Sequence, residues 1–596
     1  MTVDVVFETS FEICNKVGGI HTVISSKASL AVKSFSEYIL IGPTFAGKPS
    51  AELIEEKEPP AHWKAPLSRL ANRGIKSVVG RWLIPGEPRV ILLDFSPALL
   101  WKDGFKRALW EKFGVDSLNA QFDFDEPLAF SLAAGMLIEE FANDSAFSGK
   151  KMLSQTHEWM TGLTNLFLKA NNVRVKTVFT THATMLGRAI AGAGIDVYQA
   201  IKSMNPETAA LAARQHGVVE KFTAERACAQ YADVFTTVSD LTAREAKALL
   251  GRNPDVITQN GLLMQQFPSF EQASIIHAQS KISLSEFYRY FFFPYHKLDV
   301  ENALSFFVSG RYEFRNKGMD ITIRALGRLN EQLAREGSKR NVVTIFFVPM
   351  QQYGVKKELL ESKLFYKSIN QLLVASEKQM HDALLTNELD HPGEALPTSA
   401  VNPIFAQELR RLVKMFNRPS TTAPLCTHMI GNEQDNEVIR ALIAAGLQNR
   451  DSDHVKVIVY PIYLDGADNL LELNYYDAIN GCHLGLFASF YEPWGYTPME
   501  CAALGVPAVT ATSAGFGQFI LENSKNSREG IFVLDRLHKS DDDILNEYTR
   551  ILSDYVKLTH HERVKHKIAA KLLADKCDWT ILYEQYKRAY ELAASK

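Results

Sequence analysis

Short apolar runs alternate with longer amphipathic segments along almost the whole chain, and this alternation restricts the fold more than any other feature. Apolar runs of four to eight residues are typical of strands buried on both faces of a sheet. Helical segments between such strands favour parallel sheets with right-handed crossovers. The sequence therefore predicts an α/β protein with strands near 3–7, 38–41, 90–93, 175–180, 234–238, 306–308, 342–348, 455–460, 484–487, 506–510 and 530–533.

The chain has 596 residues, more than one hydrophobic core usually organises. An aromatic-rich stretch with few strand signals lies near 262–300, so we expect domains at 1–270 and 271–579 with a site in the cleft between them. Roughly 105 residues separate the strands that end at 348 and begin at 455, far more than one crossover needs. Helical spacing there predicts a helical insertion at about 352–450, either an assembly surface or a packed decoration of the same subunit.

Composition excludes several classes of protein. Lys and Arg number 65 against 68 Asp and Glu, a net charge of −3, so no excess of positive charge favours nucleic acid or anionic lipid. The 6 cysteines lack CxxC spacing, as in proteins with reduced, structural thiols. No apolar run approaches the roughly 18 residues of a membrane span, and charged residues in the first strand argue against a signal peptide. We expect a soluble, cytoplasmic protein with no nucleic acid or membrane partner.

Two carboxylates, Glu492 and Glu500, lie eight residues apart across a predicted strand-to-helix turn. The turn contains Gly495, and a helix is expected to start at Thr497. Backbone N–H groups at such a helix start can hold an anion, here a phosphate-bearing substrate. The alternative is that Glu500 merely complements the helix dipole and that the prolines of the turn merely shape a loop.

A glycine pair follows the first predicted strand. Gly18 and Gly19 would let backbone N–H groups approach a phosphate or sugar, and Lys16 would add a charge. The pattern matches neither a P-loop nor a GxGxxG fingerprint, and turn geometry alone would also explain it.

Polar groups also follow the predicted strand 175–180. His182 would hydrogen-bond a sugar hydroxyl, and Arg188 would meet a phosphate bidentately. His157 and Glu158 occupy a similar position after another strand. The alternative is a packed core histidine and a surface arginine.

A loop with a cation at each end follows the strand 306–308. Arg311 and Lys317 flank it, and a loop of this kind can direct both charges at one pyrophosphate, which offsets the charge on a departing nucleotide. A solvated run of charges is the alternative.

Taken together, these motifs resemble the fungal and animal type of glycogen synthase, a family of retaining glycosyltransferases. The matching segments are 16–28 (KVGGIHTVISSKA), 179–188 (FTTHATMLGR), 225–239 (ERACAQYADVFTTVS), 310–318 (GRYEFRNKG) and 481–517. Matches run from near residue 5 to 579, which is most of the chain.

The resemblance implies two Rossmann-like domains facing across a cleft, the glycosyltransferase B fold, with the final helix 580–596 completing the N-terminal domain. It implies transfer of glucose from UDP-glucose to the non-reducing end of an α-1,4-glucan, with the anomeric configuration retained. It also implies a homo-oligomer, a tetramer assembled through the helical insertion.

By the same resemblance, Arg311 and Lys317 contact the pyrophosphate, and Glu492 and His182 face the transferred glucose. Tyr475 would stack on the uracil. The other substrate-binding positions that the resemblance implies are Lys16, Gly18, Gly19, His157, Arg188, Asn260, Trp494, Gly495, Tyr496, Thr497 and Glu500. Related enzymes often have arginine where this chain has Lys16.

Cations at the diphosphate and a carboxylate beside the sugar ring suit a reaction with oxocarbenium character. Two carboxylates might instead indicate a covalent glycosyl-enzyme, but the resemblance favours attack on the same face with the departing phosphate as base. We therefore do not assign Glu492 as a nucleophile. No Asp-x-Asp metal motif is needed, so we expect no cofactor and no metal.

The sequence departs from the family in the helix that reads glucose-6-phosphate. Relatives carry several arginines there, whereas residues 560–572 contain only Arg563, with Lys567 and other lysines and histidines. His277, Lys281 and His483 match other effector positions. Because lysine cannot reproduce a bidentate guanidinium–phosphate contact, we expect weak or absent activation by glucose-6-phosphate.

Beside a phosphorylase, which would need a lysine-bound pyridoxal phosphate, two other functions stay open at this point. One is a retaining glucosyltransferase with a small soluble acceptor, such as a sucrose- or trehalose-type synthase. The other is a glucan-binding scaffold without activity, against which the retention of Glu492, Arg311, Lys317 and Glu500 argues.

Overall fold

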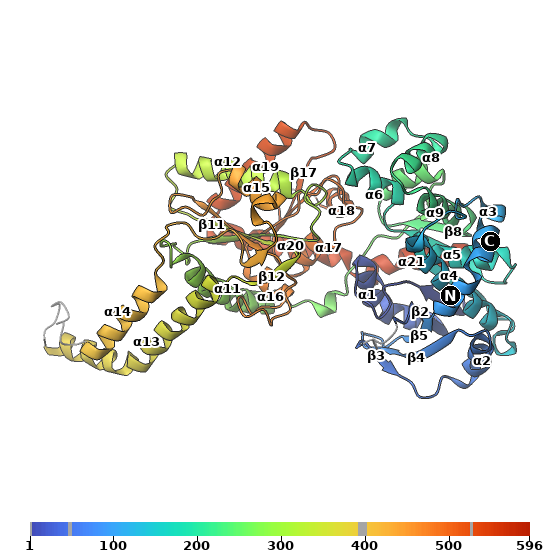
Figure 1. Cartoon of the computed structure of the whole chain (residues 1–596), viewed down its shortest axis with the longest axis horizontal. Coiled ribbons are helices and arrows are strands. Elements are labelled where there is room, and N and C mark those ends of the chain that lie inside the picture. The colour runs from blue at the N-terminus through green and yellow to red at the C-terminus, as the bar shows by residue number, and fades with distance from the viewer. Residues whose placement is uncertain (1–2, 46–50, 391–401, 525–528) are drawn as a thin grey trace.

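The computed structural model describes residues 3–45, 51–390, 402–524 and 529–596. It contains two α/β lobes, each built around its own sheet, that lie side by side (Figure 1). None of the helices within these ranges combines the length and apolar character needed to cross a membrane.

The first lobe holds a nine-stranded sheet in the order β3-β4-β5-β2-β1-β6-β7-β8-β9. Its strands are β1 (Val5–Thr9), β2 (Glu37–Pro43), β3 (Leu53–Glu55), β4 (Lys76–Trp82), β5 (Arg89–Asp94), β6 (Met152–His157), β7 (Lys176–Thr181), β8 (Val234–Thr237) and β9 (Val256–Ile257). The sheet is not wholly parallel as expected, since β4 pairs antiparallel with both β3 and β5. The connection between β4 and β5 is too short for a crossover, so these strands run in opposite directions.

The second lobe holds a parallel six-stranded sheet in the order β14-β11-β10-β15-β16-β17. Its strands are β10 (Leu304–Ser309), β11 (Val342–Phe347), β14 (Val455–Tyr460), β15 (Leu484–Leu486), β16 (Ala508–Ala511) and β17 (Ile531–Leu534). Nearly all their residues are buried, which explains the continuous apolar runs in the sequence. Helices between the strands include α12 (Met319–Arg335), α16 (Tyr475–Gly481), α17 (Tyr496–Ala503) and α18 (Gly515–Asn523), and α19 (Asp541–Lys557) follows the last strand.

The predicted insertion forms a helical hairpin. Helices α13 (Lys357–Asp390) and α14 (Pro403–Phe416) pack on each other and project away from the second lobe (Figure 1). At their base β12 (Gln352–Val355) pairs antiparallel with β13 (His428–Ile430), a ladder that the sequence did not predict. The helical hairpin is therefore shorter than the predicted insertion at 352–450. Residues 391–401 lie outside the described part of the chain.

Two helices mark where the chain passes from one lobe to the other. Helix α11 (Phe270–Phe292) runs through the stretch where we expected a boundary and packs on α16 of the second lobe. The last helix, α21 (Trp579–Ser595), packs on α1 (Gly19–Ser34) and β7 of the first lobe. Trp579 donates its indole N–H to Ser26 Oγ at 2.6 Å, so the end of the chain is part of the first lobe's core.

Candidate active site

The two lobes touch where the carboxyl ends of their strands face one another. Ser239 Oγ of the first lobe donates to the Pro493 carbonyl at 2.8 Å, and the Tyr491 hydroxyl donates to Glu245 Oε2 at 2.9 Å. Ligands of open α/β sheets collect at the carboxyl ends of the strands. The loop that carries Glu492 is therefore held by both lobes.

In the second lobe, two loops are bound to each other. Gly318 has φ +69, and a Cβ there would lie 1.7 Å from the Ala488 carbonyl oxygen, so only glycine allows this approach. The Asn316 carbonyl accepts from the backbone N–H groups of Phe490 at 2.9 Å and Tyr491 at 3.3 Å. Because these hydrogen bonds hold the two loops together, Lys317 Nζ forms an ion pair with the Glu492 carboxylate.

The predicted cations Arg311 and Arg188 belong to opposite lobes. Arg311 pairs with Glu313 at 2.9 Å, yet its side chain is 61% exposed. Arg188 is also exposed to solvent. The surrounding protein alone would lower the pKa of Arg188, but Glu158, then Tyr491, Glu313 and Glu492 raise it overall. Carboxylates of both lobes therefore act on one guanidinium.

Glu158, which follows His157 directly in the sequence, orients the His182 segment. It has φ +62, and its carboxylate accepts from the backbone N–H groups of His182 at 3.0 Å and Ala183 at 3.2 Å. Burial raises the pKa of Glu158, and Arg188 opposes that shift. The clue in the sequence is its position directly after His157, at the carboxyl end of a strand.

The glycine pair lies at the start of α1 as predicted, but part of its backbone is already occupied. Glu12 Oε2 accepts from the N–H groups of Gly18 at 2.9 Å and His21 at 2.8 Å. Gly19 faces the second lobe, because a Cβ there would lie 3.5 Å from the Tyr496 ring. Gly19 therefore allows the two lobes to approach closely. The Glu12 carboxylate already occupies the N–H groups of Gly18 and His21.

A second group of predicted residues surrounds Glu500. Tyr476 donates its hydroxyl to Glu500 Oε1 at 2.9 Å. Burial raises the pKa of Glu500 to about 7, while Tyr476 and the Lys16 charge from the first lobe oppose the shift. Tyr475 contacts Ser309 Oγ at 3.4 Å. Thus Lys16, Tyr475 and Glu500 converge near the start of α17.

The start of α17 depends on Gly495. Its φ of +112 is one that other residues rarely adopt, and it is the N-cap residue of the helix. Thr497 lies in the first turn, where backbone N–H groups have no partner within the helix. This turn is the predicted anion-binding position.

Three predicted residues are enclosed by the protein. The Trp494 ring is 4% exposed and packs near Phe516 and Phe519, so it supports the loop. His157 is 1% exposed and lies behind His182, because protein groups occupy both of its ring nitrogens. Asn260 is 4% exposed, and its Oδ1 has no hydrogen-bond partner among the described residues.

The five predicted effector residues gather in one place between α11, α16 and α20 (His560–Ala574). His277 contacts the Asn480 carbonyl at 2.6 Å, and its ring centroid lies 5.5 Å from that of His483. Burial lowers the pKa of Lys567 to about 8, with Arg563 and Lys281 adding to the shift. The charged side chains with the largest effect on Lys567 are positive, so the cluster is suited to binding an anion.

Comparison with known proteins agrees with this geometry. The glycogen synthase family profile matches residues 8–596. The chain is 34% identical over 594 residues to a Neurospora crassa protein described as glycogen [starch] synthase, covering 98% of this chain and 83% of that one. It is 33% identical over 597 residues to the Homo sapiens liver glycogen [starch] synthase, covering 99% and 83%.

Among solved structures, the catalytic domain of Starch Synthase IV from Arabidopsis thaliana, bound to ADP and acarbose, aligns with a TM-score of 0.54. The two chains are 13% identical and each is covered over 100% of its length, so this likeness concerns the fold alone. The architecture is the glycosyltransferase B fold, with two Rossmann-like domains and a helical insertion in the second. On sequence, fold and site geometry together, this chain belongs to the glycogen synthase family.

Proposed function

We propose that this protein is a glycogen synthase that transfers glucose from UDP-glucose to the non-reducing end of an α-1,4-glucan, with retention at the anomeric carbon. Family membership supports the reaction class. The single observation that carries the site assignment is the ion pair between Lys317 and Glu492, placed at the contact of the two lobes. It joins a cation suited to a diphosphate with a carboxylate suited to the neighbouring sugar.

The charges account for the chemistry. Breaking the anomeric bond places negative charge on the leaving diphosphate, which Arg311, Lys317 and Arg188 would stabilise. A diphosphate would compete for Lys317 and thereby release Glu492 toward the oxocarbenium-like glucosyl ring. Attack from the same face, with the departing phosphate as base, gives retention without a protein nucleophile.

The nucleoside would lie in the second lobe. Tyr475 would stack on the uracil, and Glu500 with the start of α17 would hold the ribose or phosphate. Because three cations neutralise the diphosphate, the proposed reaction needs neither a metal nor a cofactor.

Acceptor and donor trials test this function. Purified enzyme is incubated with radiolabelled UDP-glucose or ADP-glucose and with glycogen, fructose or glucose-6-phosphate, with and without EDTA. We expect label in glycogen from UDP-glucose, unaffected by EDTA. Transfer to fructose or glucose-6-phosphate instead would identify the sucrose- or trehalose-type alternative, and no transfer at all would favour a binding scaffold.

We further propose that glucose-6-phosphate activates this enzyme weakly or not at all. The effector cluster has one arginine, Arg563, and its guanidinium donates to the Leu558 carbonyl at 2.6 Å. The remaining cations are lysines and histidines, which do not form bidentate phosphate contacts. Assays at millimolar glucose-6-phosphate should show less than about twofold activation; several-fold activation would contradict the proposal.

We also propose a cytoplasmic homo-oligomer, a tetramer formed through the α13–α14 hairpin. Apolar side chains on this projecting element are exposed, among them Leu364 at 63%, Val374 at 69% and Ile404 at 77%. Light scattering would measure the mass of the native protein and of Val374→Glu. We expect a tetramer that the substitution weakens, and a monomeric native protein would exclude it.

A further inference from the structure

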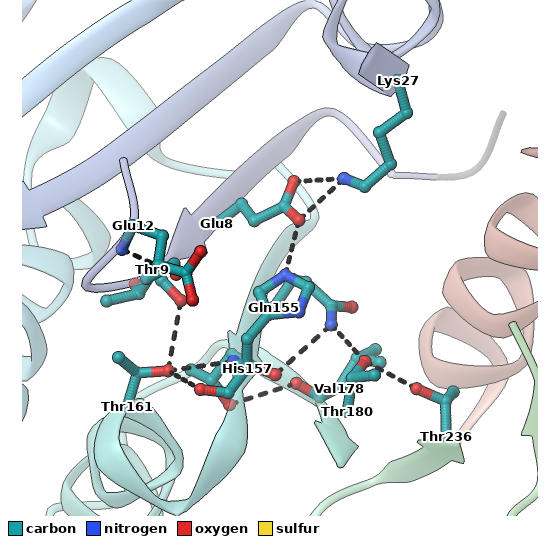
Figure 2. A network of polar contacts seen from close by, with 12 residues as sticks. Glu8, Thr9, Glu12, Lys27, Gln155, His157, Thr161, Val178, Thr180 and Thr236 are labelled. Atoms are coloured by element: carbon teal, nitrogen blue, oxygen red, sulfur yellow. Dashed lines mark hydrogen bonds and ion pairs between the residues drawn. The ribbon is translucent and has the colours of Figure 1, made fainter. Parts of the chain in front are cut away.

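Four ionisable side chains form a continuous line behind the cleft of the first lobe. Lys27 Nζ donates to both oxygens of Glu8, at 2.7 and 2.6 Å. Glu8 Oε1 lies 2.6 Å from His157 Nε2, and His157 Nδ1 lies 2.9 Å from His182 Nε2. Figure 2 shows Lys27 and His157 both directed at the Glu8 carboxylate.

The line is buried along its whole length, and its last member keeps the largest exposed fraction. Glu8 and Lys27 are 0% exposed and His157 is 1% exposed, whereas His182 retains 8%. Helix α21 covers the ion pair, since the Tyr586 ring centroid lies 5.0 Å from Lys27 Nζ. Because Nε2 of His182 is occupied by His157, Nδ1 is the ring nitrogen that is left for a ligand.

The position of each proton follows from the charge of Glu8. Burial alone would raise the pKa of this carboxyl, but Lys27 and His157 hold it well below its usual range, so Glu8 remains a carboxylate. A carboxylate only accepts, so His157 must carry a proton on Nε2. Lys27 already neutralises Glu8, and a second buried cation at His157 would have no carboxylate of its own.

A neutral His157 therefore presents an unprotonated Nδ1 to its neighbour. His182 is neutral as well, because burial, together with the charge of Arg188, keeps its pKa well below the usual value. The 2.9 Å contact then requires that His182 donate from Nε2. Its Nδ1 is left as a hydrogen-bond acceptor.

We propose that Lys27, Glu8 and His157 are positioning residues that hold the proton of His182 on Nε2, so that Nδ1 accepts a hydrogen bond from a hydroxyl group of the transferred sugar. The second half rests on the proposed function, which places the sugar at His182. The four residues thus select a sugar-nucleotide substrate with a hydroxyl group facing Nδ1 of His182. They favour a hydroxyl over a fluorine atom, which has no proton to donate.

The tautomer is measured directly on the full-length enzyme. ¹⁵N NMR of the histidine-labelled protein, with the His182 signals identified by their loss in His182→Asn, should show a neutral ring protonated on Nε2. A ring protonated on Nδ1, or a charged ring at pH 7.5, overturns the proposal. This measurement needs no ligand, so it tests the proton line separately from the sugar contact.

Glu8→Gln tests the cause. The glutamine amide can donate to His157, which removes the constraint on both rings. We therefore expect the Nε2–H signature of His182 to be lost. We also expect kcat to fall about 10- to 100-fold, with KM for the sugar nucleotide changed less than about threefold. Since an unpaired Lys27 could prevent folding, Lys27→Met/Glu8→Gln is made in parallel and should fold yet remain as slow. The matched control is Asp233→Asn, which removes a lysine-paired carboxylate at the other end of β7.

Donor analogues test the sugar contact. Among UDP-glucose analogues with one hydroxyl replaced by fluorine, one should lose kcat/KM in the native enzyme but not in His182→Ala. If the double variant keeps the native tautomer and kcat, the positioning role is overturned. If the tautomer is as expected but no analogue discriminates, the sugar contact fails while the proton line stands.

Discussion

The two halves of the site are built differently. In the first lobe, Glu8 and His157 are enclosed and Glu158 is half-buried, and all three are bonded to other protein groups before any ligand arrives. In the second lobe, the side chains of Lys317 and Glu492 are each 20% exposed and Arg311 is 61% exposed, and their partners are side chains that a ligand can replace. Buried polar groups are costly without partners, whereas exposed ion pairs exchange partners at little cost. The first half is preorganised and the second is completed by the substrate.

The strongest way to break this comparison is Glu492→Ala. If the carboxylate acts on the reacting sugar once its lysine is taken by the diphosphate, kcat should fall by about three orders of magnitude or more while nucleotide binding stays nearly unchanged. Steady-state kinetics and calorimetric titration with UDP measure the two effects. Glu433→Ala is the matched control, since it removes a carboxylate paired with Lys356 at 2.9 Å elsewhere in the same lobe. Equal losses in both variants would contradict the assignment.

Arg311→Ala should affect binding and turnover together. The guanidinium is exposed and would meet the diphosphate in both the ground state and the transition state, so we expect KM to rise and kcat/KM to fall about 100-fold. Arg411→Ala on α14, which removes an arginine that is 59% exposed and paired with Glu408, serves as the control. A change confined to kcat would instead place Arg311 with the preorganised half.

Glu225→Gln sharpens the account of the first lobe. Burial, with Glu158, raises the pKa of Glu225 from 4.5 to about 8, so the folded protein holds a proton that the unfolded chain releases between these values. The free energy of unfolding contributed by this group therefore declines as pH rises from about 4.5 to 8. The amide can still accept from the Met185 N–H and donate to Thr181 Oγ1, the two partners of the carboxyl. Urea unfolding at pH 6 and 8.5 should show a decline about 1–3 kcal/mol smaller in the variant; an unchanged decline would contradict the shift.

The smallest effect is expected for Trp579→Phe. The substitution removes the hydrogen bond to Ser26 and some packing volume where α21 covers the first lobe, so the free energy of unfolding should fall by about 1–2 kcal/mol. Differential scanning calorimetry measures the change, and Trp110→Phe, at a site 52% exposed, is the control. Because the active-site contacts stay intact, kcat should change little.

Much of the second lobe followed from apolar patterning alone. Its six strands are buried runs of apolar residues, and each was predicted to within a few positions. In the first lobe His157 was expected to follow a strand, but the bounds of β6 were not predicted, because its residues Ser154, Gln155, Thr156 and His157 are polar although all are buried. Their hydrogen bonds, such as Gln155 Nε2 to Thr180 Oγ1 at 2.7 Å, come from strands distant in sequence (Figure 2).

Local patterns of apolar residues, glycine and proline were enough to predict the α/β class, the loops that carry Arg311, Lys317 and Glu492, and the helix that begins near Thr497. The tertiary structure was needed to place Glu8, 149 positions from His157 in the chain, behind that ring. It also decided that the last helix of the chain covers the ion pair of Glu8 and Lys27. A buried charge is stable only beside its partner, and no local pattern in the sequence records which distant residue supplies it.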